Sequence, residues 1–155
     1  MKESVGLSAT INIIMIFLVV AFIFLVAIIS YAKAFKAASI VVKEIERFEG
    51  YNQSSFNFID GGLATLGYAT GNGNKCEATR KSNNMTGNLV RINDVANGLN
   101  EKYEYCIYYF NNDGDEKHYS YGVITYMTID FTIFNIKFKL PIYAKTMRLY
   151  RFTNT

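Results

Sequence analysis

A long run of apolar residues near the start of the chain constrains its fold more than any other feature. Ile13–Ile29 contains no polar residue. With Asn12, Ser30 and Tyr31, which a membrane boundary tolerates, the run reaches the roughly 20 residues that cross a ~30 Å hydrocarbon layer. We therefore expect a transmembrane helix.

A cleaved secretory signal is the alternative interpretation of the same run. Small residues that could mimic a cleavage site follow it, namely Ala32, Ala34, Ala37 and Ala38. Signal peptides usually have a shorter apolar segment, however. Here the helical pattern continues through the region where the chain would be cut, which favours an uncleaved anchor.

The helix is expected to run on beyond the membrane as an amphipathic helix. An apolar stripe recurs at spacings of three and four residues: Tyr31, Phe35, Ala38, Val42 and Ile45. Such spacing places residues on one face. With Gly50 as a stop signal, the sequence predicts one helix from about Val5 to Glu49, and hence an N-terminal helix domain over 1–50 and a globular domain over 51–155.

The two halves of this helix are expected to contact different partners. The amphipathic half, through Phe35, Ala38, Val42 and Ile45, is predicted to pack on the chain's own domain. The apolar half is predicted to contact lipid and then copies of itself, through Ile13, Phe17, Val20, Phe24 and Ala27. At the very start, the Glu3 carboxylate could pair with the terminal amine of a neighbouring copy; the alternative is that Lys2 and Glu3 are ordinary flanks at the lipid headgroups.

Residues 51–155 are expected to form a small α+β domain. Gly, Asn, Ser and Thr are frequent up to Asn100, with a short helix expected at Gly62–Tyr68 and another following Asp94. Three strand-like segments then begin at Tyr103, Tyr119 and Ile136. Pro141 indicates a bulge, a break or an edge position. The predicted fold is a long N-terminal helix packed on a small antiparallel sheet.

The two cysteines, Cys76 and Cys106, lie in this second domain and match no metal-binding spacing. A disulfide is expected if the domain lies outside the cytoplasm, and two unrelated buried thiols are the alternative. Lys33, Lys36, Lys43 and Arg47 follow the span, which by the positive-inside rule favours an inside-facing domain. Because long domains translocate largely regardless of charge, we expect a short cytoplasmic N-terminus and an extracytoplasmic domain.

Other function classes find little support in the sequence. The formal net charge of +3 is scattered, so no nucleic-acid partner is expected. His118 is the single histidine, and no nucleophile motif accompanies it. The acidic cluster formed by Asp113, Asp115 and Glu116 is expected to be a hairpin tip and not a calcium site. We therefore expect no enzyme, no metal and no cofactor.

The architecture resembles type IV pilins, and especially the tight-adherence pilin-like proteins. "AKAFKAASIVVKEIERFEGYN" is similar to the alanine-containing, mixed-charge segment after their membrane helix, and "VITYMTIDFTIF…KLPIYAKTMRLYRF" to their closing strand pair. Position five is Val5, where those proteins usually carry a glutamate.

The resemblance implies a filament or pseudopilus subunit whose helices bundle in a core while the β-rich domains face outward for surface contact. It implies copies of the chain, the membrane and a pilus assembly machinery as partners. The alternative function is a single-pass anchored binding or accessory protein of an export or conjugation machine.

Overall fold

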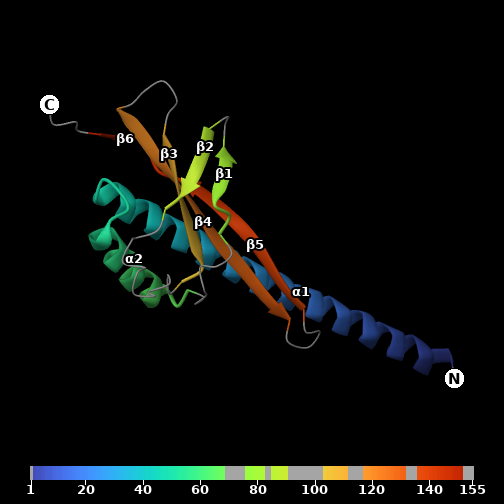
Figure 1. The fold of residues 1–155 in the computed structure, drawn as a ribbon. Coiled ribbons are helices and arrows are strands. Elements are labelled where there is room, and N and C mark those ends of the chain that lie inside the picture. Colours follow the sequence, from blue (N-terminus) through green and yellow to red (C-terminus); the bar gives the residue numbers. More distant parts are fainter. Residues whose placement is uncertain are drawn as a thin grey trace.

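The computed structural model describes residues 2–68, 76–82, 85–90, 103–111, 117–131 and 136–151. Side chains are described within these ranges except at 2–8, 130, 131, 136 and 137. Two helices precede six strands, and the long first helix packs against a curled antiparallel sheet (Figure 1). The predicted α+β class is confirmed.

Helix α1 (Lys2–Arg47) is 46 residues long, which at ~1.5 Å per residue gives about 70 Å. It contains no proline and ends at Arg47, two residues before the expected end at Glu49. Glu49 adopts a left-handed φ of 51° and Gly50 a φ of 154°, and the Gly50 amide donates to the Ile45 carbonyl at 2.9 Å. The N-terminal half of α1 projects beyond the rest of the molecule (Figure 1).

Helix α2 (Gln53–Leu66) follows after a short turn and lies against α1. Asn52 caps it, accepting from the Ser55 amide at 2.9 Å while the Ser55 hydroxyl accepts from the Asn52 amide at 2.8 Å. Gly62 lies at the contact with α1, since a Cβ there would meet the Ile40 side chain at 2.8 Å. The helix expected at Gly62–Tyr68 overlaps only the last five residues of α2, which begins nine residues earlier and ends at Leu66.

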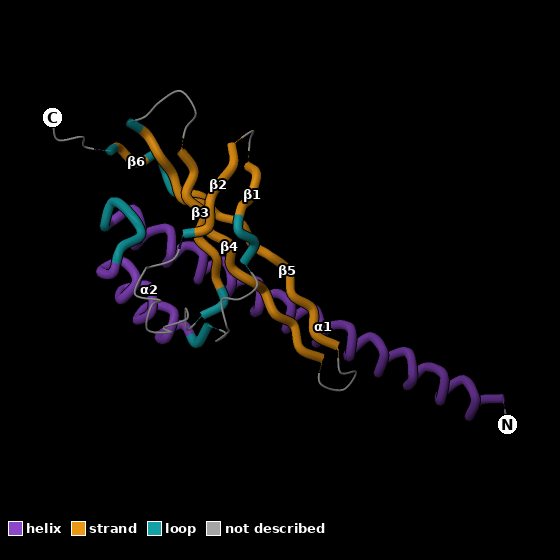
Figure 2. The backbone as a smooth tube through the Cα atoms, viewed as in Figure 1, coloured by secondary structure: helices purple, strands orange, loops and turns teal. Residues whose placement is uncertain are grey.

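Six strands form one antiparallel sheet in the order β1-β2-β3-β4-β5, with β6 also paired to β4 (Figure 2). The strands are β1 (Thr79–Ser82), β2 (Met85–Leu89), β3 (Tyr105–Asn111), β4 (His118–Phe131), β5 (Ile136–Lys145) and β6 (Leu149–Tyr150). The three strand-like segments of the sequence correspond to β3, β4 and β5–β6. Strands β1 and β2 were not expected, and the helix expected after Asp94 lies outside the described residues.

The sheet has a buried core on each face. The larger core joins it to the helices through Val41 and Ile45 of α1 and Ile107 and Val123 of the sheet. The smaller core gathers Cys106, Tyr108, Phe110 and Ile124 on the opposite face.

The sheet curls around this second core. The Phe110 ring lies so close to Gly87 and Gly122 that a Cβ would meet it at 2.5 Å and 2.7 Å respectively. The two edges of the sheet meet through side chains, because the Arg80 guanidinium of β1 lies 5.6 Å from the ring centre of Tyr143 on β5.

Pro141 occupies an edge position, one of the three alternatives, and β5 runs through it without a break. It is paired with Tyr126 of β4. The Tyr126 amide and carbonyl are both directed toward the Tyr68 hydroxyl on the β3 side. In an antiparallel ladder, opposite residues exchange both hydrogen bonds or neither. The nitrogen of Pro141 therefore faces away from β4, where the missing N–H costs no ladder bond.

Candidate functional site

The described side chains in the N-terminal half of α1 form an exposed apolar surface. From Ile11 to Ile29 nearly every large apolar side chain is exposed, around the whole circumference of the helix. Four of the five residues expected to contact lipid or other copies lie in this region: Ile13 (68% exposed), Phe17 (70%), Val20 (42%) and Phe24 (64%). Within the described residues this is one helix long and apolar enough to cross a membrane.

Ala27, the fifth of these residues, lies elsewhere. It is half-buried and packs against the core cluster that includes Met127 and Ile129 of β4. The globular domain therefore reaches down into the last turns of the apolar run. From the sequence, the contact between α1 and the globular domain was expected to begin only after Ile29, at the end of the apolar run.

Small residues form the contact between α1 and the sheet. Ala34, Ala37 and Ala38 are each at most 1% exposed, and Val41 and Ile45 are fully buried. The Thr125 hydroxyl of β4 donates to the Ala34 carbonyl at 2.9 Å. Alanine allows this close approach of strand to helix backbone, because its side chain fills little of the space between them.

The predicted stripe is right at Ala38, Val42 and Ile45, which are buried or half-buried, and wrong at Tyr31 and Phe35. Phe35 is 56% exposed. The buried face is rotated toward Ala34, Ala37 and Val41, since a phenyl ring would hold β4 away from the helix. The run of alanines could have revealed this buried face, because small residues favour close packing of a helix as much as they favour a signal-peptide cleavage site.

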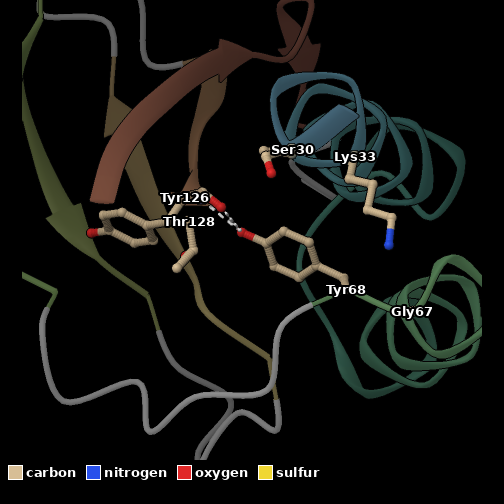
Figure 3. Close-up of a pocket in the computed structure, with 7 residues that line it drawn as sticks. Ser30, Lys33, Gly67, Tyr68, Tyr126 and Thr128 are labelled. Carbon is tan, nitrogen blue, oxygen red and sulfur yellow. Dashed lines mark hydrogen bonds between the residues drawn. The ribbon is translucent and has the colours of Figure 1, made fainter. Parts of the chain in front are cut away.

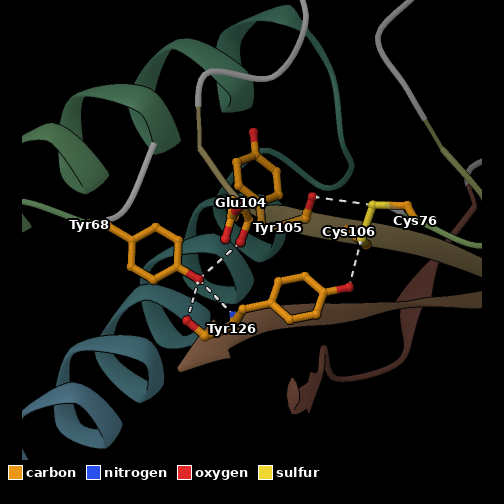
Figure 4. Close-up of a disulfide and its surroundings, with 6 residues drawn as sticks. All are labelled: Tyr68, Cys76, Glu104, Tyr105, Cys106 and Tyr126. Atoms are coloured by element: carbon orange, nitrogen blue, oxygen red, sulfur yellow. Dashed lines mark hydrogen bonds between the residues drawn. A yellow bond between two sulfur atoms is a disulfide. The ribbon is translucent and has the colours of Figure 1, made fainter. Parts of the chain in front are cut away.

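Cys76 and Cys106 form a disulfide with a Cα–Cα distance of 5.7 Å (Figure 4). The described cysteines include no free thiol, so the pairing expected from the sequence is present. The bond ties the segment before β1 to β3. The Tyr126 hydroxyl lies 3.6 Å from the Cys106 sulfur and can donate to it.

Tyr68 joins the end of α2 to the sheet beside this disulfide. Its hydroxyl accepts from the Tyr126 amide at 2.7 Å and lies 2.9 Å and 3.0 Å from the carbonyls of Glu104 and Tyr126 (Figure 4). Burial away from water, which disfavours the phenolate, raises the pKa of Tyr68 to about 12. Sequence reasoning missed this residue, because nothing in "TLGYAT" indicates a partner 58 residues away.

A small cleft of about 220 Å³ lies where α1, the end of α2 and β4 meet (Figure 3). Ser30, Lys33, Tyr68 and Thr128 contribute polar groups to its lining. The Lys33 side chain extends from α1 toward Gly67. The cleft lies just past Ile29, where the apolar run of α1 ends.

The remaining expected sites carry less information. The Glu3 side chain lies outside the described residues, so its pairing stays a prediction. In the part of the chain that the structure describes, no three His, Cys, Asp or Glu side chains are grouped to hold a metal ion. His118 packs edge-on against the Tyr150 ring at 5.4 Å between centres. The proposed hairpin tip at Asp113, Asp115 and Glu116 lies outside the described residues.

Comparisons with protein-family models, with curated proteins and with solved structures find no match to this chain. The surface of α1 and the packing of the domain upon it are therefore the basis for assigning a function.

Proposed function

We propose that this chain is a pilin-like structural subunit that polymerises through its N-terminal helix into an extracellular filament or pseudopilus. The observation that supports the proposal is the division of α1 into two parts. Its C-terminal half is buried on its own sheet through Ala34, Val41 and Ile45, while its N-terminal half projects with Phe17 and Phe24 exposed. A helix that is apolar all round requires lipid or protein as its surroundings.

The physics of the exposed half favours an open polymer. Once lipid is removed, the surface from Ile11 to Ile29 must be buried elsewhere, with a gain of ~25 cal/mol for each Å² taken from water. The same helix of a neighbouring copy offers a matching surface. Because one side of α1 would contact a different side of the next α1, the contact is heterologous and repeats into a fibre.

The proposal includes a place for each part of the chain. The N-terminus is cytoplasmic, α1 anchors the subunit in the membrane before assembly, and the β-rich domain is extracytoplasmic and available for surface contact. The Cys76–Cys106 disulfide supports export, because such bonds persist in oxidising compartments. A pilus assembly machinery would extract the subunits from the membrane.

The experiment that tests this proposal is electron microscopy of material sheared from cells that express the chain, with mass spectrometry of the N-terminus. We expect thin filaments that contain the protein. The double variant Phe17→Ala, Phe24→Ala keeps the segment apolar enough to insert, yet removes two large exposed side chains, so membrane levels should hold while sheared filament falls several-fold.

Phe58→Ala is the matched control, since Phe58 is 51% exposed on α2 and the change is chemically the same. Filament yield should be unchanged in this control. Sheared preparations without filaments, together with a monomeric protein after detergent removal, would contradict the proposal.

A second candidate function is a single-pass anchored binding or accessory protein of an export or conjugation machine. It is favoured by the close packing between α1 and the sheet, where Ala37, Val41 and Ile45 are all fully buried. In that case α1 contacts only lipid and its own domain. Retention of all the protein in the membrane fraction, with bare sheared preparations, is the outcome that selects this candidate.

A further inference from the structure

The height of the β4–β5 hairpin along α1 follows from two hydrogen bonds. The Tyr119 hydroxyl of β4 donates to the Glu49 carbonyl at 2.7 Å, and the Thr125 hydroxyl donates to the Ala34 carbonyl. At ~3.4 Å per strand residue, Tyr119 to Thr125 covers about 20 Å. At ~1.5 Å per helix residue, Glu49 to Ala34 covers about 22 Å. The strand therefore runs alongside α1, toward its N-terminus.

Beyond Thr125, the same rises per residue for strand and helix place the β4–β5 hairpin beside the apolar run of α1. Met127 lies ~7 Å beyond Thr125, near the level of Ile29, and Ile129 ~14 Å beyond it, near Leu25. The packing of Ala27 against the core cluster that includes both strand residues agrees with these levels.

Two exposed apolar residues of β5 share these levels. Leu140 is paired with Met127 and Phe138 with Ile129, and they are 53% and 52% exposed. If Ile29 marks the end of the hydrocarbon, Leu140 stands at the boundary and Phe138 about 6 Å below it. Elements that lie in the membrane interface reach ~5–10 Å into it, which matches the depth of Phe138. The last described pair of the ladder, Phe131 with Ile136, stands about 13 Å below Ile29 by the same steps.

Two aromatic residues of α1 lie just C-terminal to Ile29 along the helix. Tyr31 and Phe35 are stacked with ring centres 6.3 Å apart and are 54% and 56% exposed. The Glu46 carboxylate accepts from the Met147 amide, just after β5, at 2.7 Å. Because Phe35 is three helical turns before Glu46, it lies on the same side of α1. Tyr31, Phe35, Phe138 and Leu140 therefore gather on the β5 side, and we call them the collar.

The charge at this level suits an anionic lipid surface. Lys36 is exposed about two turns beyond Ile29, a level from which a long amine side chain can reach headgroup phosphates, and Lys33, one turn beyond Ile29, adds its positive charge from the lining of the cleft. No acidic residue stands on α1 between Glu3 and Glu44. Aromatic side chains and lysines at a hydrocarbon boundary are the usual composition of a membrane interface.

We propose that the collar inserts into the interfacial layer of the membrane, so that the β4–β5 hairpin is a second membrane contact beside α1. The occupant of this surface is phospholipid, because the collar continues the exposed apolar surface that ends at Ile29. The domain then sits against the bilayer and does not stand off from it on a stalk. The inference depends on the membrane anchoring in the proposed function and is independent of filament formation.

Single tryptophan probes test the collar cleanly, since the chain contains no tryptophan. The full chain carrying Leu140→Trp or Phe138→Trp is reconstituted at low density into vesicles of zwitterionic and anionic phospholipid, with brominated lipid as the quencher from the membrane and acrylamide as the quencher from water. Met147→Trp is the matched control, because Met147 is apolar and 74% exposed but stands at the level of Glu46.

We expect brominated lipid to quench the two collar probes at least several-fold more than the Met147→Trp probe, with acrylamide showing the reverse order. Equal quenching at the three positions overturns the inference. So does a blue shift of the collar probes that appears only at high protein density, which would identify a second copy as the occupant. Protein that fails to float with vesicles rejects the anchoring itself, and thereby the proposed function as well.

Discussion

Replacing Tyr68 with phenylalanine tests how the end of the sheet is held. The change removes one oxygen and leaves the ring in place. The Tyr126 amide, which donates to that oxygen at 2.7 Å, loses its partner, and the carbonyls of Glu104 and Tyr126 lose a donor. Tyr68 is 6% exposed, so water cannot readily replace the hydroxyl.

The expected loss of stability follows from the desolvation of these groups. A buried polar group left without a partner costs ~1–3 kcal/mol, and one hydroxyl proton shared between two carbonyls adds little more. We expect Tyr68→Phe to lower the free energy of unfolding by about 2 kcal/mol at neutral pH. Tyr31→Phe is the control, since Tyr31 is 54% exposed and its change should stay within ~0.5 kcal/mol.

The pH dependence gives this prediction a second, independent measurement. The phenol of Tyr68 has a pKa of about 12 in the folded protein and of 10.0 in its reference state. The stabilisation is therefore fully present below about pH 10 and is lost as the pH rises toward 12, because the unfolded state releases its proton first. Between about pH 9 and pH 11 the wild type should lose on the order of 1 kcal/mol that the variant does not lose.

Guanidinium unfolding of the full chain in non-ionic detergent, followed by near-ultraviolet circular dichroism, measures both quantities. Burial also raises the pKa of Tyr108, Tyr121 and Tyr126, and so the difference between wild type and variant, not either curve alone, reports on Tyr68. A difference that is below ~0.5 kcal/mol, or that stays constant from neutral to alkaline pH, would refute the reasoning.

Two further predictions concern the second core of the sheet. Removing the disulfide by Cys76→Ser with Cys106→Ser opens a loop of sequence separation 30, which in the chain-entropy account lowers the free energy of unfolding by about 3–4 kcal/mol. In denaturant titrations, reductant should cause the same loss of stability in the wild type and none in the variant. Gly87→Ala places a Cβ 2.5 Å from the Phe110 ring, so thermal unfolding should show a loss of ~1–3 kcal/mol, and unchanged stability would mean that the ring moves aside freely.

Much of α1 could be predicted from the sequence because its signals are local. The apolar run, the absence of proline and the glycine at position 50 act within a few residues, and the helix ends two residues before the expected Glu49. The start of α2 was missed for an equally local reason. Asn52 and Ser55 form a capping box, but serine at its fourth position is less recognisable than the usual glutamate or glutamine.

What the sequence could not reveal depends on residues that are distant along the chain. The helical spacing of apolar residues placed Phe35 in the predicted buried stripe. In the structure Ala34 is buried instead, because the Thr125 hydroxyl approaches its carbonyl closely. The alternation around Phe138 and Leu140 predicted a strand correctly. Alternation of apolar residues with Lys137 and Lys139 is typical of a strand with one buried face, but the structure leaves Phe138 and Leu140 half-exposed because α1 covers mainly β4. The pilin resemblance stays a prediction.

The curl of the sheet also bears on which contacts neighbouring copies of the molecule can make. Open sheet edges are templates for strand addition between molecules. Here the outer strands are turned toward each other, and Tyr143 of β5 lies against Arg80 and within 3.5 Å of the Ser82 hydroxyl of β1. Along the rest of β5, Pro141 presents a ring where an approaching strand would need an amide. Indiscriminate fusion of neighbouring sheets is thereby discouraged along the described parts of both outer strands.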